Sequence, residues 1–182
     1  MVTLDTERLI LRGWRDADVA PWAALNADPA VREFLGPPLT FAESAASVRR
    51  FQEGFERNGY GLWAVEIRDT GGFIGFTGLH PLDGMPFDGV EVGWRLAREA
   101  WGHGYATEAA RAALAYGFGT AGLDEILSVT AATNVRSQAV MRRLGMTTDP
   151  ADDFDHPRVL SGPLRPHVLY RIRATPRAES KS

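Results

Sequence analysis

Apolar and polar side chains alternate in residues 2–12 and 90–96, which is the pattern of a half-buried β-strand. Four other apolar stretches are also predicted strands: residues 62–67, 73–79, 126–131 and 167–173. The spacing of apolar residues between these strands predicts four helices: residues 16–26, 41–58, 106–119 and 134–144. No linker or repeat interrupts this order. We therefore expect a single domain, residues 1–174, followed by a polar C-terminal tail, residues 175–182.

Capping residues indicate where the predicted helices begin. Asp16 is the expected N-cap of the first helix, and Asn134 is that of the last. Thr40 and Glu43 have the spacing of a capping box, in which each side chain accepts a hydrogen bond from the other residue's backbone. The helix that starts there is predicted to bury one apolar stripe: Phe41, Ala45, Val48, Phe51 and Phe55.

Two glycines, Gly102 and Gly104, stand between the strand at 90–96 and the helix that follows it. Glycine adopts backbone angles closed to other residues, and the first N–H groups of a helix lie unpaired at the positive end of its dipole. Such a turn can hold a phosphate or pyrophosphate. A dinucleotide fingerprint is incomplete, because Thr107 stands where its third glycine belongs, and no Gly-Lys-Ser/Thr triplet is present. The alternative is a turn that merely makes a tight connection.

The segment WGHGYATEA over residues 101–109 resembles the acetyl-CoA loop of the GNAT N-acetyltransferase superfamily. It is most similar to the RimJ/RimL-type branch, which acetylates the N-terminal amines of ribosomal proteins. Gly104 and Ala106 fit the last two anchors of that loop, and Trp101 stands where the superfamily usually has Gln or Arg. The resemblance extends over residues 6–171. It implies an α/β protein of the α+β type, with a mixed, mostly antiparallel sheet of about seven strands and helices on both faces.

The resemblance also implies acetyl-CoA as the co-substrate. The strands before and after the main helix should splay apart, with the pantetheine arm in the gap. Arg142 and Arg143 could reach the 3′-phosphate of the cofactor, although a solvated helix face explains them nearly as well. The implied cofactor-binding residues are Trp94, Arg95, Leu96, Trp101, Gly102, His103, Gly104, Tyr105, Ala106, Thr107, Asn134 and Arg142.

Acetyl transfer to an amine requires a neutral amine, a polarised thioester carbonyl and a departing thiolate. Glu91, on the predicted central strand, is the first candidate for the base, and its alternative is a solvated strand carboxylate. His80 is the second candidate because the pKa of a histidine suits a base, and its alternative is an ordinary loop histidine. The chain has no cysteine, which favours direct attack of the amine in a ternary complex over an acetyl-enzyme.

Ser137 is the third candidate catalytic residue. Many relatives outside this branch place a tyrosine acid in the last helix, and this helix has none. By resemblance Ser137 lies near the thioester sulfur and could donate a proton to the thiolate. The alternative is helix capping, which Asn134 and Ser137 could both perform at this position.

The composition of the chain indicates which kinds of partner it lacks. The formal net charge is −3 and the pI is about 5.8, which gives no support for nucleic-acid binding. No apolar run is long enough to span a bilayer, so we expect no membrane partner and a cytoplasmic location. The histidines do not have metal-site spacing, so no metal is assigned. The acidic segment 152–156, expected near the acceptor entrance, could attract a cationic amine or be a plain solvated loop.

Two functions remain open at this point. The first is an acetyl-CoA-dependent N-acetyltransferase, a monomer or homodimer, whose acceptor is a protein N-terminus or a small amine. The second is a non-catalytic module that binds acyl-CoA as a sensor or scaffold on the same fold. The identity of the acceptor amine does not follow from the residues.

Overall fold

The computed structural model describes residues 2–175 and contains one mixed sheet of nine strands. Its six longer strands are β2 (Leu9–Arg12), β3 (Leu62–Ile67), β4 (Phe73–Pro81), β5 (Val90–Leu96), β6 (Glu125–Ala131) and β9 (Pro166–Arg173). Three strands have two residues each: β1 (Leu4–Asp5), β7 (Thr147–Thr148) and β8 (Phe154–Asp155). The α/β prediction with a mostly antiparallel sheet is confirmed, and the short strands raise the number above the predicted seven.

The strand order is β1-β2-β3-β4-β5-β6-β9-β7, with β8 also paired to β9. Every pair is antiparallel except β5 and β6, which are parallel and share only the register pair Glu91 and Leu127. Beyond that pair the two strands part, as the resemblance implied, and the parting lies at the centre of the sheet.

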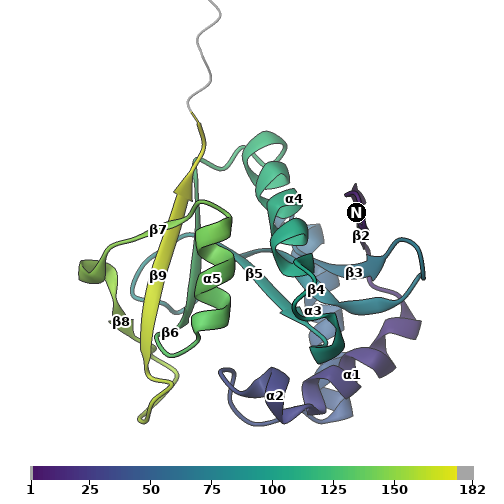
Figure 1. The fold of residues 1–182 in the computed structure, drawn as a ribbon, viewed down its shortest axis with the longest axis horizontal. Coiled ribbons are helices and arrows are strands. Elements are labelled where there is room, and N and C mark those ends of the chain that lie inside the picture. Colours follow the sequence, from purple (N-terminus) through teal and green to yellow (C-terminus); the bar gives the residue numbers. More distant parts are fainter. Residues whose placement is uncertain (1, 176–182) are drawn as a thin grey trace, which may run out of the picture.

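Helices cover both faces of the sheet (Figure 1). They are α1 (Val19–Ala27), α2 (Pro29–Arg32), α3 (Phe41–Asn58), α4 (Tyr105–Gly119) and α5 (Val135–Arg143), with 3-10 turns η1 (Asp16–Asp18), η2 (Arg98–Ala100) and η3 (Pro150–Asp152). One face packs on α4 and α5, and small buried residues of α4, such as Ala109 and Ala113, let that helix lie close to the strands. The other face packs on α1 and α3 through Trp22 and Val48. Val92 and Leu96 of β5 are buried in the layer that includes α4.

The first predicted strand, residues 2–12, is wrong as a single element. The chain turns at residues 6–8 and forms a hairpin, in which Leu4 of β1 faces Leu11 of β2. The Thr6 side chain stabilises this turn, because its hydroxyl accepts a hydrogen bond from the Leu9 backbone N–H at 2.9 Å. Four polar residues in a row, 5–8, interrupt the apolar alternation at this turn, and the prediction of one strand overlooked this break.

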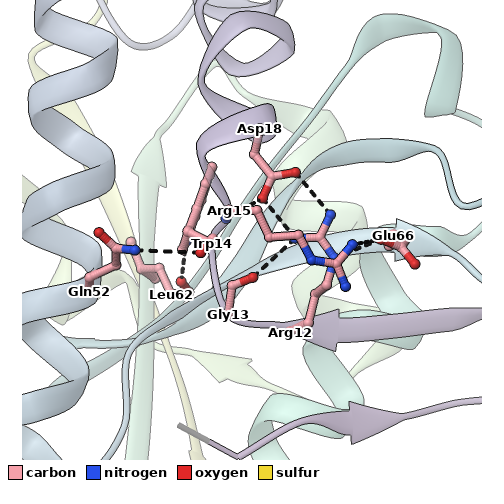
Figure 2. A network of polar contacts seen from close by, with 8 residues as sticks. All are labelled: Arg12, Gly13, Trp14, Arg15, Asp18, Gln52, Leu62 and Glu66. Carbon is pink, nitrogen blue, oxygen red and sulfur yellow. Dashed lines mark hydrogen bonds and ion pairs between the residues drawn. The ribbon is translucent and has the colours of Figure 1, made fainter.

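Asp16 is not the N-cap that the sequence predicted, because the aspartate that binds backbone here is Asp18. Its carboxylate accepts from the Arg15 N–H at 2.8 Å and receives both Arg12 terminal nitrogens, at 2.7 and 2.9 Å. Arg12 also donates from Nε to Glu66 at 2.6 Å (Figure 2). Arg12 and Asp18 are buried, so this ion pair ties β2 to the start of α1 and to β3. The Asp18 carboxylate therefore serves mainly as the buried counter-charge of Arg12, and Asp16 does not cap the helix.

The capping box of α3 is confirmed, since Thr40 accepts from the Glu43 N–H and Glu43 accepts from the Thr40 N–H. Phe41, predicted to be buried, is 62% exposed; it is the first residue of the helix, and the buried part of the stripe begins further along. The short helix α2 was not predicted; Asp28 caps it by accepting from the Ala30 N–H. The predicted tail lies outside the described residues from position 176 onward.

Candidate active site

A cavity of about 1020 Å³ lies where the parted end of β5, the N-terminus of α4, helix α2 and the start of α5 meet. All the predicted cofactor-binding residues except Arg142 line it, so segments far apart in the sequence converge there. Further lining residues that the sequence had not marked include Arg8, Phe34, Leu35, Glu108, Arg111 and Arg136. The cavity is large enough for an extended cofactor arm and an acceptor.

The floor of the cavity is the glycine turn. Gly102 and Gly104 have φ angles of +82° and +81°, the left-handed region that favours glycine. Gly104 is the N-cap of α4 and has no side chain to cap it, so the N–H groups of Tyr105 and Ala106 are free to bind an anion. The first backbone bond of the helix is made by Glu108, which donates to the Gly104 carbonyl at 3.1 Å. The glycine turn and the helix start lie where the sequence predicted them, and the binding of an anion there stays a prediction.

Glu108 lies in the first turn of α4, where a free carboxylate would repel a phosphate. Its charge is taken up by Arg8, whose guanidinium lies 2.6 Å from it, and by Thr6, whose hydroxyl donates at 2.6 Å. Burial raises the pKa of Glu108, but these hydrogen bonds outweigh burial and hold the pKa below its usual value. Arg8 also donates to the His103 carbonyl at 3.0 Å, which fixes the glycine turn. Nothing in the spacing of Arg8 and Glu108, a hundred residues apart, indicated this network.

The opposite wall is the start of α5. Asn134 is its N-cap, since its side chain accepts from the Ser137 N–H at 3.1 Å. Asn134 also donates to the Ser137 hydroxyl at 3.1 Å and to Thr130 at 2.9 Å. Asn134, and not Ser137, is therefore the cap of this helix. The Ser137 hydroxyl can still donate its hydrogen toward the cavity, which Ser137 lines.

The basic residues of α5 divide between the cavity and the surrounding structure. Arg142 donates to the Tyr170 hydroxyl at 3.1 Å and does not line the cavity, whereas Arg143 does. Arg136 lies over the Trp101 ring, 4.6 Å from its centroid, and pairs with Glu33. The assignment of the 3′-phosphate to Arg142 thus receives no support from its position.

Glu91 and His80, the two candidate bases, face each other on β5 and β4. Glu91 Oε2 lies 3.2 Å from His80 Nε2, and Glu91 Oε1 accepts from the Val129 N–H on β6 at 3.1 Å. The Glu91 side chain is only 12% exposed, while that of His80 is 42% exposed. Glu91 therefore bridges β5 and β6 where they part, and His80 is the more accessible member of the pair.

The surroundings of His80 favour its charged form. Burial lowers the pKa of His80, but the hydrogen bond and the charge of Glu91 together with the Pro81 carbonyl outweigh burial and raise the pKa above its usual value. The Pro81 oxygen lies 3.0 Å from Nδ1, so both ring nitrogens have an acceptor close by. The Glu91 carboxylate and the His80 imidazole can share one proton, so the pair has the groups that a general base needs. Neither residue lines the large cavity.

The acidic segment 152–156 is largely neutralised by basic neighbours. Asp152 pairs with Arg171, and Asp155 pairs with Arg165 at 3.0 Å. Because these two aspartates already have basic partners, the segment has little unpaired negative charge to attract a cationic amine. Over residues 2–175, no cluster of three metal-ligating side chains occurs, and no helix is both long and apolar enough to cross a membrane.

A family model described as an acetyltransferase (GNAT) domain matches residues 8–147, and the chain belongs to this family. The uncharacterized N-acetyltransferase YoaA of Bacillus subtilis is 31% identical over 144 residues, which are 78% of this chain and 81% of that protein. The crystal structure of an acetyltransferase from Agrobacterium tumefaciens has a TM-score of 0.79 and 31% identity, covering 96% and 95% of the two chains. The chain is therefore an enzyme of the N-acetyltransferase class.

RimL, a ribosomal L7/L12 alpha-N-protein acetyltransferase solved in complex with coenzyme A, has a TM-score of 0.76 and covers 94% of this chain and 98% of its own. Its identity to this chain is 15%, so this likeness concerns the fold alone. The two proteins therefore share this fold over almost their whole lengths.

Proposed function

We propose that this protein transfers the acetyl group of acetyl-CoA to a primary amine by direct attack in a ternary complex. The observation that carries the proposal is the convergence, in one cavity, of the start of α4, the end of β5 that has parted from β6, and the start of α5. A pyrophosphate needs unpaired N–H groups such as those at the start of α4. A pantetheine arm with its thioester fits beside the parted end of β5.

The pyrophosphate binds, in this proposal, to the backbone N–H groups that follow Gly104. Three arginines near α4 and α5 line the cavity and favour a polyanionic cofactor: Arg8, Arg111 and Arg143, against the acids Glu7 and Glu108. Because Arg8 already neutralises Glu108, the start of α4 stays attractive to phosphate. Trp94 and Leu96 on β5 and Asn134 on α5 flank the path of the arm.

The acceptor amine loses its proton to the pair formed by His80 and Glu91. His80 is the exposed member, and in its neutral form it takes the proton at Nε2, while Glu91 holds the imidazole in place and stabilises the charged form that results. An amine with a pKa near 8, such as a peptide N-terminus, needs less of this help than a lysine-type amine does. After attack, the Ser137 O–H donates to the departing thiolate, which is itself a fair leaving group.

The alternative is a module that binds acyl-CoA without turnover. Relatives named N-acetyltransferases give this alternative no support, and a proton-accepting pair beside the parting of β5 and β6 has no use in a passive binder. The deciding experiment incubates the protein with acetyl-CoA and a panel of peptides and small amines, and measures free thiol and acetylated amine. Acetylated amine formed in step with thiol supports the enzyme, and cofactor binding without product from any amine contradicts it.

A further inference from the structure

Arg95 is a cation without a counter-charge in the wall of the cavity. Its Nη1 donates to the neutral Asn26 side-chain oxygen at 2.7 Å. Its Nε is fully buried and finds no hydrogen-bond partner in the described part of the chain, residues 2–175. Within the same residues no carboxylate forms an ion pair with Arg95, although Arg8 and Arg136 in the same cavity each have one.

The surroundings of Arg95 make the unpaired charge costly. Its guanidinium lies against two aromatic rings, 5.2 Å from the Trp22 centroid and 5.5 Å from that of Phe76. Burial, and to a smaller extent the charge of buried Arg32, lower the pKa of Arg95 to about 9, which leaves the group charged at pH 7. An unsatisfied buried charge is destabilising, so a protein that keeps one at a cavity wall gains when an anion binds there.

Arg95 shares one face of β5 with the proposed base. Alternate residues of a strand point to the same side, so Glu91, Gly93 and Arg95 all face the layer of α1 and α3. The backbones of Glu91 and Arg95 are about 13 Å apart along the strand at about 3.3 Å per residue. His80 Nε2 reaches over Gly93, however, which is only about 7 Å from Arg95 along the strand, so a small amino carboxylate can contact both His80 and Arg95. A Cβ on Gly93, midway between them, would touch only His80 Nε2, at 3.9 Å, so the space above the glycine is open.

We infer that the acceptor is an amino carboxylate, held with its amine toward His80 and Glu91 and its carboxylate on Arg95. The inference rests on the proposed function, since it names the acceptor of that reaction. An arginine presents Nε and a terminal nitrogen as a fork that matches the two oxygens of a carboxylate. The neutral Asn26 holds the fork in place without competing for the charge, and open space above Gly93 gives the acceptor room.

The cofactor phosphates have their own donors elsewhere in the cavity. The start of α4 and Arg8 surround the glycine turn, while the partners of Arg95 are Asn26, Trp22 and Phe76 on α1 and β4. Loss of Arg95 should therefore weaken the acceptor and spare coenzyme A.

The test compares acids with their amides. β-Alanine, phenylalanine and alanyl-phenylalanine are each offered as free acid and as primary amide to the protein loaded with coenzyme A, and binding is measured by calorimetry. The rate of acetylation with acetyl-CoA is measured for the same compounds. We expect at least one acid to bind and react about 10- to 100-fold better than its amide, as charge-assisted hydrogen bonds to arginine imply.

Variants assign the preference to Arg95. Arg95→Met should bring the acid-to-amide ratio near one with unchanged coenzyme A affinity, and Arg95→Lys should keep part of the preference. Arg136→Met is the matched control, because this cavity arginine already pairs with Glu33, and the ratio should stay as in the native protein.

Several results would overturn the inference. They are a native protein for which no acid binds better than its amide, a preference that survives in Arg95→Met, and a loss of coenzyme A affinity in that variant with the ratio intact. If Arg95→Met fails to fold, the comparison of acids with amides on the native protein still tests whether the acceptor carboxylate is recognised. Absence of acetylated product with every compound counts against the proposed function, and the binding ratios still decide the role of Arg95.

Discussion

Replacing Gly104 by valine separates backbone strain from loss of cofactor binding. Gly104 has a φ of +81°, and a Cβ there would meet only Arg8 Nη2, at 3.6 Å, which is an ordinary contact. The protein itself therefore resists the substitution mainly through its backbone. A left-handed conformation costs a residue other than glycine roughly 1–2 kcal/mol, and a β-branched residue somewhat more. For a chain of this size each kcal/mol corresponds to a fall of about 2–4 °C in melting temperature.

The effect on coenzyme A should be larger than this strain. The valine side chain lies where the phosphate approaches the N–H groups at the start of α4. A hydrogen bond to a charged group contributes about 1.5–3 kcal/mol, so the loss of one such bond weakens binding by about 10- to 100-fold. Calorimetric titration with coenzyme A measures this loss directly.

Gly59→Val is the matched control for this prediction. Gly59 also has a positive φ, +73°, and open space where a Cβ would lie, but it ends α3 away from the cavity. We expect the two variants to lose similar stability, and only Gly104→Val to lose coenzyme A. Equal coenzyme A affinity in two folded variants would refute the assignment of the phosphate to this turn.

Three further outcomes are expected. Ser137→Ala should lower kcat by less than the ~10²-fold usual for acid–base catalysis, because a thiolate leaves readily, with the melting temperature almost unchanged; full kcat would show that the hydroxyl has no part in transfer. The pKa of His80 is raised, so the stability that its charged form contributes is present below pH 6.5 and is lost as the pH rises through the raised pKa. The free energy of unfolding should therefore fall across this pH window in the native protein and not in Glu91→Gln. Equal pH dependence of the two proteins in urea titrations would contradict the pairing. Asp18→Ala should cost about 3 kcal/mol of unfolding free energy, the lower end for buried pairs because Glu66 still pairs with Arg12, and a loss below about 1 kcal/mol in the same assay would be too small for a buried charge left half-paired.

Local signals predicted the parts of this protein that local chemistry decides. The capping box at Thr40 depends on neighbours within a few residues and was predicted correctly, and the glycine turn before α4 also lies where the sequence placed it. The hairpin inside residues 2–12 was missed because its turn lacks Gly, Pro and Asn, so the break in alternation at residues 5–8 was not taken as a turn.

The site required information that the sequence carries only through the fold. Glu91 and His80 were each candidates, but their contact follows from the register of β4 on β5, which no spacing revealed. The pairing of Arg8 with Glu108 joins opposite halves of the chain. Arg95 was marked as a cofactor residue by resemblance, and only burial and the missing partner at Nε indicated a different use.

The most direct test of the central claim is mass-spectrometric detection of acetylated amine from native protein, acetyl-CoA and the amine panel. The account predicts an N-acetylated product with at least one amine, formed in equal amount with free thiol, and a rate that falls sharply in Glu91→Gln and in His80→Gln. Tight binding of acetyl-CoA with no acetylated product from any amine would contradict the account and point to a module that binds the cofactor without turnover.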